Sequence, residues 1–334
     1  MGYQLWHRAI PLVRAFRFGM VELYALDHVV LACDFEIDGM AVRGVAGGNP
    51  VPRGVLKDSS LPIDTERRRL VDAVHAIARV ALELPASGSV FGLWWSLYRR
   101  SRATGIVQPA LLAQLAESLV ERAAIDAACR QHGRTFRAML REDRLGFDPA
   151  HVDPAMERSA IDRASLPWAR EDAVSLRVRH TVGLADPVEA IPGCLQADGI
   201  TGLKIKLAGD AEADLHRLGA IGRTLDGSGC AVERVTLDGN ENYGSLDEYE
   251  RLIAGLSAGR DQHVLIRQIR WIEQPFRRDR ALAEEIAPVL RRHADWPVVI
   301  DESDARVHDL QHALAMGYAG TTHKSCKGVF KSML

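Results

Sequence analysis

The 334-residue sequence lacks the features that mark several classes of protein. Its five cysteines are widely spaced and form no Cys-x-x-Cys pair, which argues against a disulfide framework or a zinc site and fits a reducing compartment. No apolar stretch is long enough to span a bilayer, and residues 1–20 lack the uninterrupted apolar core of a signal peptide. The net charge is −2 without a basic block, so nucleic acid gains no electrostatic support as a partner. We therefore predict a cytoplasmic protein that binds neither membrane nor nucleic acid.

The first part of the chain, residues 1–150, is predicted to form an α+β domain. Short strands are expected within residues 20–46, with a hairpin turn at Asp38-Gly39, and helices are expected from 64 to 145. The clearest helix lies between Pro109 and Gly133, where apolar residues recur at helical spacing. Residues 44–54 are rich in glycine and proline and predict a loop, either a lid over a site or a plain connector.

The second part, residues 151–334, shows a different pattern. A proline-rich, charged segment at 147–172 is the expected linker. After it, short apolar strands alternate with helical stretches such as 246–256 and 281–292, which predicts a parallel (β/α) barrel of the TIM type. The expected strands are Ser175–Val178, Gly202–Leu207, Val235–Asp238, Ile269–Glu273, Val298–Asp301 and Gly320–Lys324.

Three of these predicted strands end in an acid: Asp238, Glu273 and Asp301. Neighbouring parallel strands bring their carboxyl ends to one rim, where barrel enzymes keep their chemistry. Three negative charges at such short distances need a positive charge to balance them. Ligands that are all oxygen atoms select a hard divalent cation such as magnesium. Any one of these acids could simply end a strand near solvent, but three in register favour a metal site.

Lysines accompany the acids. Strand alternation in Gly202–Leu207 places Lys204 and Lys206 on one face, and we expect mutual repulsion and a nearby metal to lower a lysine pKa enough to make a base. By itself, a Lys-x-Lys pattern fits a solvated strand face equally well. Lys324 is expected at the end of the last strand, opposite Lys206, with Lys327 as its rival. His323 should point away and pack.

Taken together, the motifs resemble the enolase superfamily. Those that carry the resemblance are Leu203-Lys204-Ile205-Lys206, Leu237-Asp238-Gly239-Asn240, Ile272-Glu273-Gln274-Pro275, Ile300-Asp301-Glu302-Ser303 and His323-Lys324. Their order resembles the mandelate racemase/muconate lactonizing enzyme family, in particular the muconate-lactonizing and dipeptide-epimerase branch, which carries a lysine on both sides of the site. The first 150 residues look like that family's capping domain, with residues 44–54 at the place of its mobile specificity loop.

The resemblance implies a reaction and a set of roles. A substrate carboxylate binds Mg²⁺, with Mn²⁺ as an alternative, and a base removes the proton on the adjacent carbon through an enediolate. Asp238, Glu273 and Asp301 would hold the metal; Asp301 is preferred to Glu302 because the family uses the first acid of its Asp-Glu-Ser run. Lys206 and Lys324 would be the two acid/bases and Lys204 would tune Lys206. Asn240 would orient a ligand group.

The expected activity is that of a racemase or epimerase on a small carboxylic acid, in a homo-oligomer. A lyase (dehydratase) or cycloisomerase would use the same residues with one lysine as base. The segment from 173 to 334 is shorter than the about 250 residues of a closed barrel, so we also expect a C-terminally truncated barrel of about six units, and an inactive relative is a third alternative. Substrate choice is expected to depend on residues 44–54 and, if they face the site, on Trp94 and Trp95.

Overall fold

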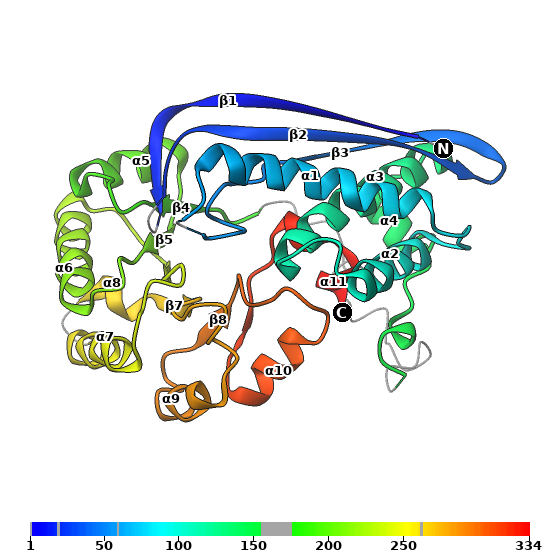
Figure 1. Cartoon of the computed structure of the whole chain (residues 1–334). Coiled ribbons are helices and arrows are strands. Elements are labelled where there is room, and N and C mark those ends of the chain that lie inside the picture. The colour runs from blue at the N-terminus through cyan, green and yellow to red at the C-terminus, as the bar shows by residue number, and fades with distance from the viewer. Residues whose placement is uncertain (1, 19–20, 59, 155–175, 261–262) are drawn as a thin grey trace.

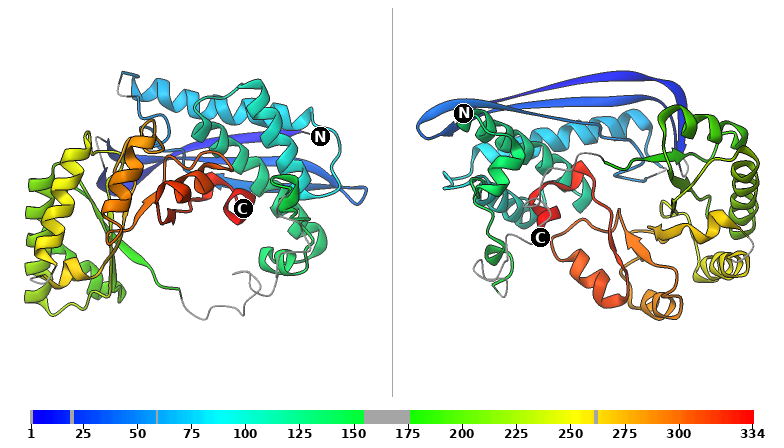
Figure 2. Two further views of the ribbon diagram at one scale, coloured as in Figure 1. Left: turned by 90° about the horizontal axis from the view of Figure 1, so that it is seen from below. Right: turned by 180° about the vertical axis from the view of Figure 1, so that it is seen from behind.

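The computed structural model describes residues 2–18, 21–58, 60–154, 176–260 and 263–334. An antiparallel sheet with a helical layer comes first, followed by a parallel sheet with helices along its outside (Figures 1 and 2). This arrangement confirms the predicted fold class. Within the described ranges, no helix combines the length and the apolar character that crossing a membrane requires.

The antiparallel sheet has the order β1-β2-β3 and is longer than the sequence predicted. The prediction of short strands within 20–46 was wrong for residues 21–37, because one long strand runs through that range, and the strand before residue 20 was missed. That first strand is mostly exposed, so its position is set by main-chain pairing with its neighbour and not by an apolar pattern. The strands are β1 (Tyr3–Phe18), β2 (Val21–Ile37) and β3 (Met40–Gly48).

The glycines of this region lie in the hairpin turn and in the second half of β3. Asp38 and Gly39 have φ of 52° and 75° and connect the paired residues Ile37 and Met40, so the predicted hairpin is confirmed. The predicted loop at 44–54 begins later than expected, because β3 continues to Gly48. Gly44 serves close packing there: a Cβ atom on it would lie 1.9 Å from the carbonyl oxygen of Ala123.

A helical layer covers one face of this sheet. The helix predicted between Pro109 and Gly133 is confirmed as α3 (Ala110–His132), which ends at Gly133 with φ of 59°. It packs against β3 and β2 and is buried along most of its length (Figure 1). The other helices of the layer are α1 (Ile63–Leu82), α2 (Val90–Thr104) and α4 (Phe136–Arg141).

The second sheet, within the described residues, contains six parallel strands in chain order. Two predicted strands were misplaced. The first begins at Arg179, where pairing with Gly202 starts, and part of the predicted range lies outside the described residues. The last ends at Thr321 because its partner ends at Ile300. The strands are β4 (Arg179–Val182), β5 (Gly202–Lys206), β6 (Arg234–Asp238), β7 (Ile269–Glu273), β8 (Val298–Ile300) and β9 (Gly320–Thr321).

Helices follow most of these strands and cover the outside of the sheet (Figure 1). The helix predicted at 246–256 is confirmed as α7, whereas 281–292 is helical only in its second half. That shorter α-helix begins at Ala287, directly after a 3₁₀ turn at Glu284–Ile286, and Pro288 occupies its first turn, where the missing N–H of proline costs no hydrogen bond. The helices are α5 (Ile191–Asp198), α6 (Ala211–Ser228), α7 (Leu246–Gly259), α8 (Val264–Arg267), α9 (Ala287–Arg292) and α10 (Asp309–Met316).

The C-terminal segment returns to the helical layer. Its last helix, α11 (Phe330–Met333), lies beside the helices of the first part of the chain (Figures 1 and 2). Phe330 is fully buried, and its ring centroid lies 5.2 Å from that of Phe91 and 5.7 Å from that of Trp94. The predicted linker at 147–172 lies largely outside the described residues, although residues 149–151 form a short 3₁₀ turn. The division at residue 150 stays a prediction.

Candidate active site

Three acids lie at the carboxyl ends of adjacent strands, as the sequence predicted. Asp238 ends β6 and pairs in register with Glu273, which ends β7; Asp301 follows β8 directly. All three are almost completely buried. The parallel sheet therefore concentrates negative charge in a place that water reaches poorly, and the charge must be balanced nearby.

The two lysines of β5 supply part of this balance. Lys204 Nζ lies 2.8 Å from Asp238 Oδ2 and 2.8 Å from Glu273 Oε2, while Lys206 Nζ lies 2.6 Å from Asp238 Oδ2. Both lysines thus point to the same side of the sheet, as strand alternation predicted. Burial lowers the pKa of Lys204, but the charges of Asp238 and Glu273 outweigh burial and raise it. The expected drop, which depends on a bound metal, stays a prediction.

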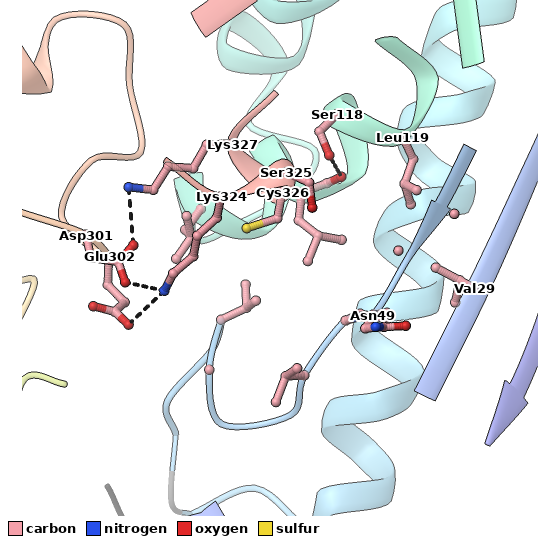
Figure 3. Close-up of a pocket in the computed structure, with 18 of the residues that line it drawn as sticks. Val29, Asn49, Ser118, Leu119, Asp301, Glu302, Lys324, Ser325, Cys326 and Lys327 are labelled. Atoms are coloured by element: carbon pink, nitrogen blue, oxygen red, sulfur yellow. Dashed lines mark hydrogen bonds and ion pairs between the residues drawn. The ribbon is translucent and has the colours of Figure 1, made fainter. Parts of the chain in front are cut away.

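The second lysine group follows β9. Lys324 makes an ion pair with Asp301 and lies 3.6 Å from Glu302 Oε1, while Lys327 Nζ lies 3.3 Å from Asp301 Oδ1 (Figure 3). Lys324 was predicted to end the last strand. It instead lies beyond the strand and precedes the short turn Ser325–Lys327. The side chain of Lys324 is 42% exposed and that of Lys327 only 2%, so Lys324 is the one that can reach a ligand.

The ammonium group of Lys327 is held by other groups of the protein. Its ammonium group donates to the carbonyl oxygen of Thr322 at 2.7 Å and lies 3.4 Å from Asp304 Oδ2. His323 is not among the residues that line the cavity, and its ring contacts Ser332 of α11. The residue is exposed, so the predicted packing role is wrong. Both lysines line the cavity, but these contacts hold Lys327 within the protein and favour Lys324 as the one available to a ligand.

Burial and the neighbouring charges shift the pKa values of these acids in opposite directions. Burial, followed by the charge of Asp238, raises the pKa of Glu273 to about 7. Burial, followed by the charge of Asp301, raises the pKa of Glu302 to about 7. Burial also acts on Asp301, but Lys324 and Lys327 outweigh it and hold the pKa of that carboxyl below its usual range.

Every lysine of the sequence takes part in this charge balance. The chain has 42 lysines and arginines, of which only six are lysines, and each of the six lies within ion-pair distance of a carboxylate at or beside this rim. A basic surface built almost entirely from arginine was a signal in the sequence that pattern reasoning overlooked. The concentration of lysine at this rim points to the site, because the pKa of lysine is shifted more easily than that of arginine.

Sequence reasoning also missed Gln274, which holds the third acid in place. Its Oε1 accepts hydrogen bonds from the backbone N–H of Asp301 at 2.7 Å and of Ser303 at 3.2 Å, and its Nε2 donates to Ser303 Oγ at 2.7 Å. Gln274 has φ of 37°, in the left-handed region, and is buried. A single side chain thus fixes the end of β8 to the end of β7. Its place directly after Glu273 was visible, but its cross-strand contact was not.

The loop after β3 is tied to the same rim. Arg278 donates to the carbonyl oxygen of Gly54 at 3.0 Å and forms an ion pair of 2.6 Å with Glu241. Lys57 lies 3.4 Å from Glu241 and donates to the backbone carbonyl of Asn240. The predicted lid segment therefore lies over the rim. Asn240 itself places its backbone N–H 3.0 Å from Asp238 Oδ1.

A cavity of about 550 Å³ joins these groups to the first part of the chain. Figure 3 shows Asp301, Glu302 and Lys324 on one side and Val29 and Leu119 on the other. Lys206, Asn240 and the segment from Gly47 to Val55 also line it, whereas Trp94 and Trp95 do not. The condition under which the two tryptophans would influence substrate choice is not met, because they pack with Phe91 and Tyr98 beside α11.

The donor chemistry fits the predicted divalent metal. The candidate ligands Asp238, Glu273 and Asp301 offer oxygen atoms alone, the set that magnesium prefers. Both carboxylate oxygens of Asp301, Oε2 of Glu302 and Oδ1 of Asn240 are buried without a hydrogen bond. Within the described residues, no three His, Cys, Asp or Glu side chains are gathered as a metal cluster, since lysines stand between the acids. The ligand assignment stays a prediction.

The sequence and the fold are both similar in part to known proteins. Residues 188–323 match the family described as enolase C-terminal domain-like. No curated protein matches the sequence. The fold is similar to that of a mandelate racemase/muconate lactonizing protein from Herpetosiphon aurantiacus (TM-score 0.67, 21% identity, covering 99% of this chain and 77% of that one).

Two further solved structures share the fold. One is a dipeptide epimerase from Cytophaga hutchinsonii complexed with Mg and the dipeptide D-Ala-L-Val (TM-score 0.66, 17% identity, 99% of this chain and 74% of that one). The other is a muconate lactonizing enzyme from Pseudomonas fluorescens complexed with muconolactone (TM-score 0.63, 17% identity, covering 98% of this chain and 73% of that one). The chain therefore shares the fold of these proteins, and residues 188–323 resemble the enolase C-terminal domain.

Proposed function

We propose that this chain, which carries an enolase C-terminal domain-like segment at residues 188–323, abstracts the proton next to a substrate carboxylate and acts as a racemase or epimerase. The observation that carries the proposal is the placement of Lys206 and Lys324. Both line one cavity, yet one ends β5 and the other follows β9, with three strands between them in the sheet. A ligand held between them meets a proton acceptor on one face and a donor on the other.

A divalent metal, magnesium by the chemistry of its donors, would be held by Asp238, Glu273 and Asp301. When bound, it supplies positive charge beside the carboxylate on which negative charge develops. Its positive charge would also balance the carboxylates that Lys204 and Lys324 balance in this structure. Lys206 would remove the α-proton on one face, Lys324 would return a proton on the other, and Lys204 would tune Lys206.

A lyase or cycloisomerase is the second candidate, since a structure with this fold is a muconate lactonizing enzyme. The same constellation then needs one lysine as base. Incubating the protein with single enantiomers of α-substituted carboxylic acids and Mg²⁺ in deuterated water separates the two. Deuterium entering with inversion supports the epimerase; loss of water or ring closure supports the alternative.

The decisive control is the Lys206→Ala/Lys324→Ala double variant, which should incorporate no deuterium under the same conditions. If the unaltered protein, folded by its cooperative melting curve, exchanges no α-proton and converts no acid in the presence of Mg²⁺, the proposed function is wrong. A chain that binds Mg²⁺ without any turnover would instead fit the inactive relative.

A further inference from the structure

The cavity has two chemically different ends. Lys206, Lys324, Asp301 and Glu302 form the polar end, where the proposed reaction would take place. Figure 3 places Val29 and Leu119 away from that end, beside the polar Asn49 and Ser118. Six aliphatic residues from β2, α3 and the loop after β3 line the cavity. These residues are Val29, Leu111, Leu115, Leu119, Val51 and Val55.

The polar groups at the apolar end already have partners in the protein. His28 Nδ1 lies 2.6 Å from Asn49 Oδ1, and Ser118 Oγ donates to the carbonyl oxygen of Leu115 at 2.8 Å. Arg122 donates through Nε to the carbonyl oxygen of Ser118 at 3.1 Å and through Nη1 to that of Gly47 at 2.6 Å. A hydroxyl or second carboxylate placed there would compete with these bonds for its partners, chiefly the Arg122 guanidinium, and this competition disfavours it.

We infer that the substrate is a monocarboxylic acid whose remainder is apolar, an aromatic or branched alkyl group held against α3 and β2 while its carboxylate lies at the lysine end. The inference rests on the proposed function and adds the substrate class. The volume of about 550 Å³ suits a small molecule of this kind. Gly47 and Gly48 line the cavity without side chains, so β3 leaves the space open.

Three acids that each carry an α-proton test the inference: 2-phenylpropanoate, 2-methylglutarate and gluconate. Calorimetric titration of the whole protein with Mg²⁺ should show 2-phenylpropanoate binding at least about tenfold more tightly than the other two. Tighter binding of 2-methylglutarate would show that Arg122 accepts a second carboxylate, and tighter binding of gluconate would show a polar pocket. Either result, or no measurable binding of 2-phenylpropanoate, overturns the inference.

A pair of matched variants tests the location. Val51→Asn places an amide at the apolar end and should weaken 2-phenylpropanoate binding about tenfold, whereas Val45→Asn alters an exposed valine of β3 outside the cavity and should leave binding unchanged. Melting curves check that both variants are folded. Equal affinity of Val51→Asn and the unaltered protein would contradict the location.

Exchange in deuterated water separates this inference from the proposed function. If the polar acids exchange their α-protons and 2-phenylpropanoate does not, the substrate class is wrong and the reaction stands. If 2-phenylpropanoate binds in the expected order but never exchanges, the pocket is as inferred and the proposed reaction is wrong.

Discussion

Glu121 of α3 accepts a hydrogen bond from the backbone N–H of Phe330 at 2.7 Å, and so joins the first part of the chain to the segment that carries Lys324. The same carboxylate accepts from the N–H of Val329, and Gln114 of α3 donates to the carbonyl oxygen of Lys327 at 2.9 Å. A Cβ atom on Gly328 would lie 2.5 Å from Glu121 Oε2. The helix thus holds the backbone on both sides of the turn that follows Lys324.

Glu121 should make stability fall as the pH rises. Burial raises its pKa from 4.5 to about 7, so the folded protein keeps a proton that the unfolded chain loses between these values. The unfolded state binds fewer protons in that window, and the free energy of unfolding therefore decreases with rising pH, by about 3 kcal/mol from this group. Urea denaturation of the Glu121→Gln variant from pH 4.5 to 7.5 should show a flatter dependence by that amount. The exposed Glu36→Gln should match the unaltered protein, and a Glu121→Gln profile parallel to it would contradict the assignment.

The two lysines should act on opposite faces of the substrate. Lys206→Gln and Lys324→Gln are each expected to slow α-proton exchange of one enantiomer by about 10²–10⁴-fold, since each removes one acid/base group. NMR of separate enantiomers in deuterated water measures this. His323→Gln is the control beside Lys324, because His323 does not line the cavity. Loss of exchange for the same enantiomer in both lysine variants would argue for a single base and against the epimerase.

Magnesium should stabilise the folded chain. At a concentration a hundredfold above its dissociation constant, a ligand of the folded state adds about 2.7 kcal/mol to the free energy of unfolding. Asp301→Asn should abolish most of the rise in melting temperature with Mg²⁺, whereas the exposed Asp295→Asn should retain it. A full Mg²⁺ response in Asp301→Asn would remove Asp301 from the ligand set and favour Glu302.

Gly44 should tolerate no side chain. Because a Cβ atom would lie 1.9 Å from the Ala123 carbonyl oxygen, Gly44→Ala must push β3 away from α3, and we expect a loss of about 1–3 kcal/mol in the free energy of unfolding. Gly193→Ala in α5 is the matched control, because a Cβ atom there meets nothing within 4 Å and alanine favours a helix. Urea midpoints measure both. Equal midpoints for Gly44→Ala and the unaltered protein would contradict the packing.

The sequence by itself determined the order of the site. Short apolar strands that end in Asp238 and Glu273 need a parallel sheet, and parallel neighbours bring those acids to one rim; strand alternation likewise paired Lys204 with Lys206. Local rules sufficed here because both patterns depend on residues adjacent in the chain. The helix between Pro109 and Gly133 followed from its own periodicity in the same way.

The tertiary structure decided what the site can reach. Lys324 faces the cavity and Lys327 is buried because β9 ends early and α3 holds the segment beyond it, a contact made by Gln114 and Glu121 across more than two hundred residues. The apolar half of the cavity is likewise assembled from β2, α3 and the loop after β3. Such side chains meet only through packing between distant segments, and the shifted pKa values follow from the burial and charge that this packing creates. No local pattern encodes either of them.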